Sequence, residues 1–191
     1  MGAEFQNAPV LHICTFLQEN DFHTNICSLQ DALKRRGEMN CIDIYEYRKL
    51  MCTLAIYLAF NGQRLCAALS LKKSEIEGAK NYRGAHIVRV AAHKTAKARG
   101  PAAFCLKEKQ YQSFLKFSEL QTQLKMTSEF IFISPSGGKA TRLFEPLDDF
   151  LKIRYGAYEK ITFNWLRKAI HSNKHLSPFR NEKIVVQSRA I

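Results

Sequence analysis

Three short strings of the sequence carry cationic side chains in settings that suit a phosphate group. The first is AFNGQRLCAALSL, with Arg64 just after an Asn-Gly helix stop, and the second is VRVAAHKTAKARGPAAFCL, with Lys94 at the end of an expected strand. The third is ITFNWLRKAI, which places Arg167 on an apolar helix. A guanidinium fork can bind two phosphate oxygens at once, whereas lysine is a flexible point charge. These residue types make phosphate a candidate ligand.

The same residues also have plain structural interpretations. Arg64 could cap a helix or pair with Glu75. The cluster of Lys94, Lys97 and Arg99 could be a solvated turn between two strands. Neither interpretation is excluded by the local sequence.

The third string raises a stricter question, because a buried guanidinium group needs a partner. A phosphate is one candidate partner for Arg167, and an internal carboxylate such as Asp148 or Asp149 is the other. Trp165 has apolar neighbours at helical spacing and is expected in the core. His93, next to the lysine of the second string, is expected at the surface end of a strand.

The charge of the chain is strongly positive and unevenly distributed. The formal net charge is +12, and residues 1–60 hold five Lys/Arg against seven Asp/Glu. Residues 61–128 hold thirteen against four, and residues 129–191 eleven against six. Clustered cations bind polyanions by releasing condensed counterions, so this excess favours a nucleic-acid-binding face. A merely soluble basic surface is the alternative.

The cysteines and the hydropathy pattern indicate a soluble intracellular protein. The six cysteines form no CxxC pair and no Cys/His pair at zinc spacing, so we expect buried free thiols and neither metal nor cofactor. The first residues lack the features of a signal peptide, and no stretch reaches the ~18 apolar residues of a membrane span.

Hydrophobic periodicity predicts an α+β domain that is mainly α-helical. Helices are expected over residues 24–37, 44–60 and 107–125, with a short one opening at Ser74 and two or three more after Leu143. Strands are expected over 85–94 and 102–106, joined as an antiparallel hairpin with Lys94 near its tip, and over EFIFIS. Residues 1–23 are expected to be an N-terminal extension, partly left over from expression, and residues 24–191 the domain.

The ordered trio of Arg64, Lys94 and Arg167 resembles the Arg, Lys, His-x-x-Arg order of tyrosine recombinases. The sequence HKT at residues 93–95, followed by GPA at residues 100–102 and an apolar strand, is similar to the Crypton-derived recombinase domains of animal genomes. The resemblance is strongest over residues 44–191. It implies the fold of a recombinase catalytic domain, a helical body with a small antiparallel sheet, with double-stranded DNA as the partner and the nucleus as the location.

The resemblance also assigns roles to individual residues. Arg64 and Arg167 would stabilise the charge on a phosphodiester under attack, and Lys94 would donate a proton to the leaving oxygen. Asn164 occupies the place of the family's histidine, and it cannot shuttle a proton at neutral pH. His93, Lys97, Arg99 and Lys168 are the further residues expected to contact DNA.

The last element of the family's chemistry, a nucleophilic tyrosine after the second arginine, has no counterpart among these residues. Twenty-four residues follow Arg167, and none of them is tyrosine. Tyr155 and Tyr158 precede that arginine and are expected in the core or on the surface. A homo-oligomer would not supply the nucleophile in trans, because each copy would lack it.

The sequence therefore predicts a DNA-binding domain of recombinase ancestry that does not cleave DNA, a pseudoenzyme. One alternative is a fragment of an active recombinase or transposase whose tyrosine segment lies outside this chain. A second alternative is a protein-interaction module that keeps only the fold. Convergence of Arg64 and Arg167 on one basic concavity would favour DNA binding over the interaction module.

Overall fold

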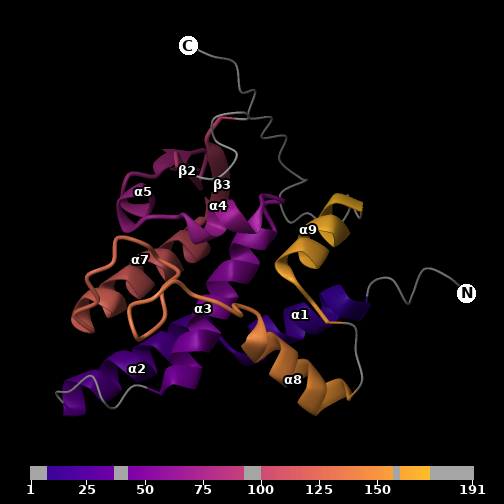
Figure 1. Ribbon diagram of the computed structural model, residues 1–191, viewed down its shortest axis with the longest axis horizontal. Coiled ribbons are helices and arrows are strands. Elements are labelled where there is room, and N and C mark those ends of the chain that lie inside the picture. Colours follow the sequence, from indigo (N-terminus) through magenta and orange to yellow (C-terminus); the bar gives the residue numbers. More distant parts are fainter. Residues whose placement is uncertain (1–7, 37–42, 93–99, 157–159, 173–191) are drawn as a thin grey trace, which may run out of the picture.

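The computed structural model describes residues 8–36, 43–92, 100–156 and 160–172. Most of these residues are helical, and three short strands form one small sheet, as predicted for an α+β, mainly helical class (Figure 1). None of the described helices is long and apolar enough to cross a membrane. In chain order the elements are α1 (Ala8–Glu19), α2 (Phe22–Arg36), α3 (Ile44–Ala59), α4 (Leu65–Leu69), α5 (Lys73–Glu77), β1 (Lys80–Tyr82), β2 (Ala85–Val90), β3 (Ala102–Lys107), α7 (Glu108–Gln123), α8 (Glu145–Tyr155) and α9 (Phe163–Ser172).

Helix α3 is the central element of the body. Asp43 caps it by accepting hydrogen bonds from the backbone N–H groups of Tyr45 and Glu46, at 2.8 and 3.3 Å. Most of its residues from Tyr47 onward are buried, so the helix is covered on nearly all sides. It contacts α2, α4, α7, α8 and α9, which surround it in Figure 1. A helix that is apolar around its circumference has to be enclosed in this way.

The N-terminal helix α1 belongs to this body. Ile13 and Phe16 are almost fully buried in the same core cluster as α3, and α1 contacts α8. Residues 1–23 were expected to be an extension, but the boundary at residue 24 does not separate α1 from the core. The sequence VLHICTFL is ambiguous because short apolar runs suit a helix or a strand equally.

The sheet is an antiparallel meander in the order β1-β2-β3. The predicted hairpin is confirmed, since Ala85 to Val90 pair with Lys107 to Ala102 in register. Strand β1 adds a third strand that periodicity did not reveal. It joins β2 through Arg83 and Gly84, whose φ angles of 50° and 79° are those of a type I′ hairpin turn.

The prediction of a strand over EFIFIS, residues 129–134, is wrong. The segment forms only isolated bridges, Phe130 with Lys72 and Ile133 with Lys139. Three consecutive residues, 131 to 133, are buried, whereas a strand on a sheet surface alternates. Buried side chains hold this segment instead: Tyr47 Oη donates to the Ile133 carbonyl at 3.1 Å, and Gln121 Nε2 donates to the Ile131 carbonyl at 2.8 Å.

The other predicted helices are confirmed with small shifts of their ends. Residues 24–37, 44–60 and 107–125 correspond to α2, α3 and α7, and the short helix expected at Ser74 is α5. After Leu143 the described residues contain α8 and α9.

The burial of α1 generates a stability prediction. Phe16 is 1% exposed and Leu11, on the same helix, is 66% exposed. We expect Phe16→Ala to lower the free energy of unfolding by about 3–5 kcal/mol, because it leaves a cavity in the core. Leu11→Ala should change it by less than about 0.5 kcal/mol. Urea denaturation measures both values, and equal small losses would mean that α1 is not part of the cooperative unit.

Candidate nucleic-acid interface

The turn between α3 and α4 places Arg64 at the surface. The chain leaves α3 through backbone hydrogen bonds from Asn61 N to Leu58 O and from Gly62 N to Ala59 O, both 3.0 Å. Gly62 has a φ of 72°, a conformation that favours glycine. Arg64 then occupies the N-cap position of α4 without a side-chain capping bond, and it is exposed.

Two polar side chains of this turn bind the free edge of β3. The amide N–H of Cys105 donates to Asn61 Oδ1 at 2.6 Å, and Gln63 Nε2 donates to the Ala103 carbonyl at 3.2 Å. Asn61 Nδ2 also donates to the Tyr57 carbonyl, at 3.0 Å, which ties the same side chain to α3. These bonds substitute for a neighbouring strand along the edge. They fix the backbone next to Arg64 against the sheet.

Neither Asn61 nor Gln63 was identified from the sequence as a site residue. Asn-Gly was interpreted only as a helix stop, and polar residues in a turn are ordinarily solvated. Their side chains reach residues forty or more positions away, a relation that local periodicity does not reveal.

The sequence left open that Arg64 pairs with Glu75, but the structure does not show this pair. The Glu75 Oε1 accepts the backbone N–H of Ala91 at 3.0 Å, and its Oε2 accepts that of Lys72 at 2.9 Å. Glu75 therefore secures the end of β2 to α5, where the connection between β2 and β3 begins. His93, Lys94, Lys97 and Arg99 lie in that connection, outside the described residues.

Helix α9 carries the remaining predicted site residues. Thr162, directly before the helix, caps it, because its Oγ1 accepts a hydrogen bond from the Trp165 N–H at 3.1 Å. Asn164 and Lys168, four residues apart, are both exposed on one side of the helix. Arg167 lies between that side and the buried Leu166 and is itself half-buried. Trp165 is partly buried against the core, as expected.

One buried atom of Arg167, its Nε, lacks a partner among the described residues. This atom is inaccessible to solvent and makes no hydrogen bond in the part of the chain that the structure describes. A buried N–H group without an acceptor costs about 1–3 kcal/mol. An internal carboxylate therefore does not satisfy this atom, although the sequence offered Asp148 and Asp149 as candidates.

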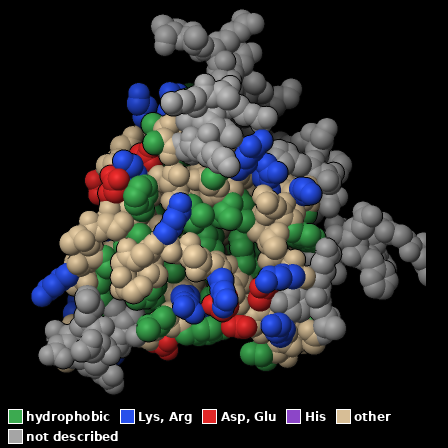
Figure 2. Space-filling model, viewed as in Figure 1, with side chains coloured by type: hydrophobic (Ala, Val, Ile, Leu, Met, Phe, Trp, Pro, Cys, Tyr) green, Lys and Arg blue, Asp and Glu red, His purple; other side chains and the backbone are tan. Residues whose placement is uncertain are grey.

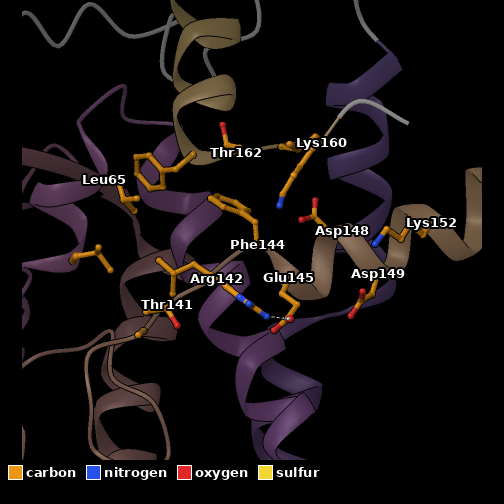
Figure 3. A pocket seen from close by; sticks show the side chains of 15 residues that line it. Leu65, Thr141, Arg142, Phe144, Glu145, Asp148, Asp149, Lys152, Lys160 and Thr162 are labelled. Atoms are coloured by element: carbon orange, nitrogen blue, oxygen red, sulfur yellow. Dashed lines mark ion pairs between the residues drawn. The ribbon is translucent and has the colours of Figure 1, made fainter. Parts of the chain in front are cut away.

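A pocket of about 580 Å³ lies between α4, the segment before α8, and the start of α9 (Figure 3). Leu65, which follows Arg64, and Phe163, which precedes Asn164, both line it. The two helices that carry the predicted arginines thus border the same hollow at their first residues.

The rim of this pocket carries both signs of charge. Arg142 pairs with Glu145 at 3.5 Å, and Arg48 pairs with the same carboxylate at 3.0 Å. Figure 3 shows the Lys160 and Asp148 side chains pointing toward each other from opposite sides. The pocket therefore does not form a uniformly cationic groove. The cations of the candidate interface are those at the border of the pocket, on Arg64 and on α9.

The bond between Asn61 and β3 generates a prediction. We expect Asn61→Ala to speed hydrogen exchange at the Cys105 amide and to lower the free energy of unfolding by about 1–3 kcal/mol, since a partly buried donor loses its acceptor. Asn61→Asp keeps an acceptor oxygen in place and should protect the Cys105 amide. Unchanged exchange at Cys105 in Asn61→Ala would show that this bond does not hold the edge.

Comparison with known proteins identifies the fold. No family model and no curated protein matches the sequence. Among solved structures, the chain is similar to the XerH site-specific recombinase bound to palindromic difH substrate in a post-cleavage complex, with TM-score 0.50 and 15% identity over 83% of this chain and 41% of that one. A pre-cleavage complex of XerH is similar too, with TM-score 0.49 and 16% identity over 71% and 40%. The chain spans about two fifths of these recombinases, and its fold is tyrosine-recombinase-like.

Proposed function

We propose that the chain is a DNA-binding domain of tyrosine-recombinase ancestry that contacts duplex phosphates through Arg64, Arg167 and Lys94. The observation that carries the proposal is the buried Nε of Arg167, which has no hydrogen-bond partner among the described residues, on a recombinase-like fold. A guanidinium group that lacks an internal acceptor is suited to an external one with several oxygens, and a phosphodiester provides these.

The surroundings of the two arginines support the same proposal. Arg64 is exposed and follows a turn that is bonded to β3, so its backbone is held while its side chain is free to extend. Asn164 and Lys168 flank Arg167 on the exposed side of α9 and would add a hydrogen-bond donor and a charge. Contacts of this kind position a protein on DNA and depend weakly on base sequence.

The proposal includes the absence of strand cleavage by this chain. Cleavage through a covalent intermediate requires a nucleophile at the scissile phosphate. No tyrosine follows Arg167 in the 191 residues, and Asn164 cannot transfer a proton as a histidine would. Tyr155 lies on α8, with its ring stacked on His12 at a centroid distance of 3.8 Å, which assigns it a packing role. Tyr158 lies outside the described residues.

Two further parts of the proposal come from the resemblance of residues 88–106, VRVAAHKTAKARGPAAFCL, to Crypton-type domains. The domain derives from a transposable element of that kind, and it acts in the nucleus, where duplex DNA is found. The competing function is a fragment of an active recombinase, and the observation in its favour is that the chain spans 41% of the XerH chain. A natural reading frame that continues to a tyrosine soon after Ile191 would show that the chain is a fragment of an active recombinase.

A gel-shift titration against salt, paired with a covalent-adduct assay on a nicked duplex, tests the proposal. We expect Arg64→Ala and Arg167→Ala each to weaken duplex binding by ~1.5–3 kcal/mol at most and to reduce the salt slope by about 0.9 per lost phosphate contact. Lys94→Ala should have a smaller effect because a flexible lysine loses more side-chain entropy on binding. The exposed Lys125, at the end of α7, provides the control Lys125→Ala.

In the second arm, the unmodified chain should form no covalent adduct. An adduct mapped to Tyr155 or Tyr158 would contradict the proposal. Unaltered affinity in the double arginine variant would favour the interaction module instead.

A stability measurement separates a binding role of Arg167 from a structural one. We expect Arg167→Met to leave the thermal midpoint unchanged or to raise it, because an unsatisfied buried N–H is replaced by an apolar group of similar length. Duplex affinity should fall in the same variant. The control Arg64→Met, at an exposed position, should change the free energy of unfolding by less than about 0.5 kcal/mol. Strong destabilisation by Arg167→Met without DNA would mean that its guanidinium group is held internally.

A further inference from the structure

We propose that the outer face of the sheet is a second phosphate-binding surface. It would extend the contact with duplex DNA beyond Arg64 and Arg167, which we call the arginine site. The residues that form the second surface are Lys80, Arg83, Arg89 and Lys107, with Tyr82 among them, and we call this surface the sheet face. This inference rests on the proposed function, because it takes the same duplex as the ligand.

Strand register places these residues on one side of the sheet. Val88 and Val90 of β2, and Phe104 and Leu106 of β3, are fully buried, so their side faces the body, where the strands contact α5 and α7. The alternate residues must point the other way. Arg89 is paired with Ala103 on that outer side.

The remaining cations follow from the same register. Lys80 is paired with Ile87, and Lys107 with Ala85, so both share the outer side with Arg89. All three side chains are exposed. Lys80, Arg83 and Arg89 form no ion pair with any described residue.

The strands of the sheet carry no carboxylate of their own, and Glu108, directly after Lys107, lies 2.6 Å from His86 Nε2 of β2. Residues 78–107, which include all three strands, contain seven Lys/Arg and no Asp/Glu. A solvated surface usually mixes the two signs, because unpaired like charges repel one another. Figure 2 shows basic side chains near the sheet end, with acidic ones close by beside α5.

The turn between β1 and β2 holds one of these cations in place. The Arg83 guanidinium carbon lies 5.3 Å from the centre of the Tyr82 ring, a cation–π distance. Tyr82 is half exposed, so the pair stands at the surface. An arginine that is already ordered loses less entropy when it binds a phosphate.

The sheet face is continuous with the arginine site. Arg89 is directly opposite Ala103, whose carbonyl accepts the hydrogen bond from Gln63, and Gln63 precedes Arg64. This contiguity favours one shared polyanion over two separate ligands. The Arg89 and Lys107 positions are separated by four residues of pairing, roughly 14 Å, which is comparable to the ~12 Å width of the major groove. The surface can therefore meet more than one phosphate.

The test compares a sheet-face triple variant with a charge-matched control. Lys80→Gln, Arg83→Asn and Arg89→Gln together remove three positive charges from exposed positions. Lys34→Gln, Arg35→Gln and Lys125→Gln remove three from exposed positions on α2 and after α7. We expect the salt slope of duplex binding to fall by about 0.9 for each lost contact in the first variant, up to roughly 2.7, and by much less in the control. Thermal unfolding confirms that both variants are folded.

The outcomes separate this inference from the proposed function. If the sheet-face variant and the control have equal slopes while Arg64→Ala and Arg167→Ala weaken binding, the sheet face is not a DNA surface and the proposed function stands. If the sheet-face variant loses slope and the arginine variants do not, the inference stands and the arginine site fails. Wild-type protein that binds no duplex at low salt overturns both. Loss of binding to vesicles containing phosphatidylserine, with duplex binding unchanged, would reassign the sheet face to a lipid surface and overturn the inference.

Discussion

The enclosure of α3 determines where the elements of the candidate interface lie. A helix that is buried around its circumference must be covered by neighbours, and α4 and α9 are two of the helices that contact it. Arg64 begins the first of these and Arg167 lies on the second. Their backbone positions are therefore fixed by apolar packing and by the bonds of Asn61 and Gln63 to β3, against the mutual repulsion of the cations. The interface can be cationic because the core, and not the charge distribution, holds it together.

Two features of this surface are unfavourable in the isolated protein, and the same partner would relieve both. The Nε of Arg167 is desolvated without an acceptor among the described residues, and the sequence between residues 78 and 107 contains cations and no carboxylate. Phosphate oxygens would supply the missing acceptor, and a polyanion would remove the repulsion while releasing its own counterions. Natural proteins tolerate such local costs at binding surfaces more often than elsewhere.

The sequence was informative where local periodicity and tertiary packing agree. The apolar spacing of α3 and the β-rich alternation of β2 and β3 predicted these elements and their antiparallel pairing, although β2 ends at Val90, before its predicted end. EFIFIS was predicted wrongly, since residues 131–133 are buried consecutively and the segment forms only isolated bridges, with further hydrogen bonds from Tyr47 and Gln121. The role of Asn61 was missed for the same physical reason: its partner, the Cys105 amide, is set by the tertiary fold. Arg167 was expected to need a partner if it is buried, and the absence of an acceptor for its Nε among the described residues could only be seen in three dimensions.

Phosphate binding and strand cleavage make separable demands on this fold. Binding needs cations at fixed positions, and the packing of α4 and α9 on α3 together with the bonded edge of β3 meets that demand without any reactive group. Cleavage needs in addition a nucleophile and a group that transfers a proton, and an asparagine at position 164 supplies neither. Substitution of a reactive side chain on the exposed face of α9 would leave the core contacts of Phe163 and Leu166 intact. A recombinase-like fold can therefore keep its packing when exposed side chains of α9 change, which is the physical basis of the proposal of DNA binding without cleavage.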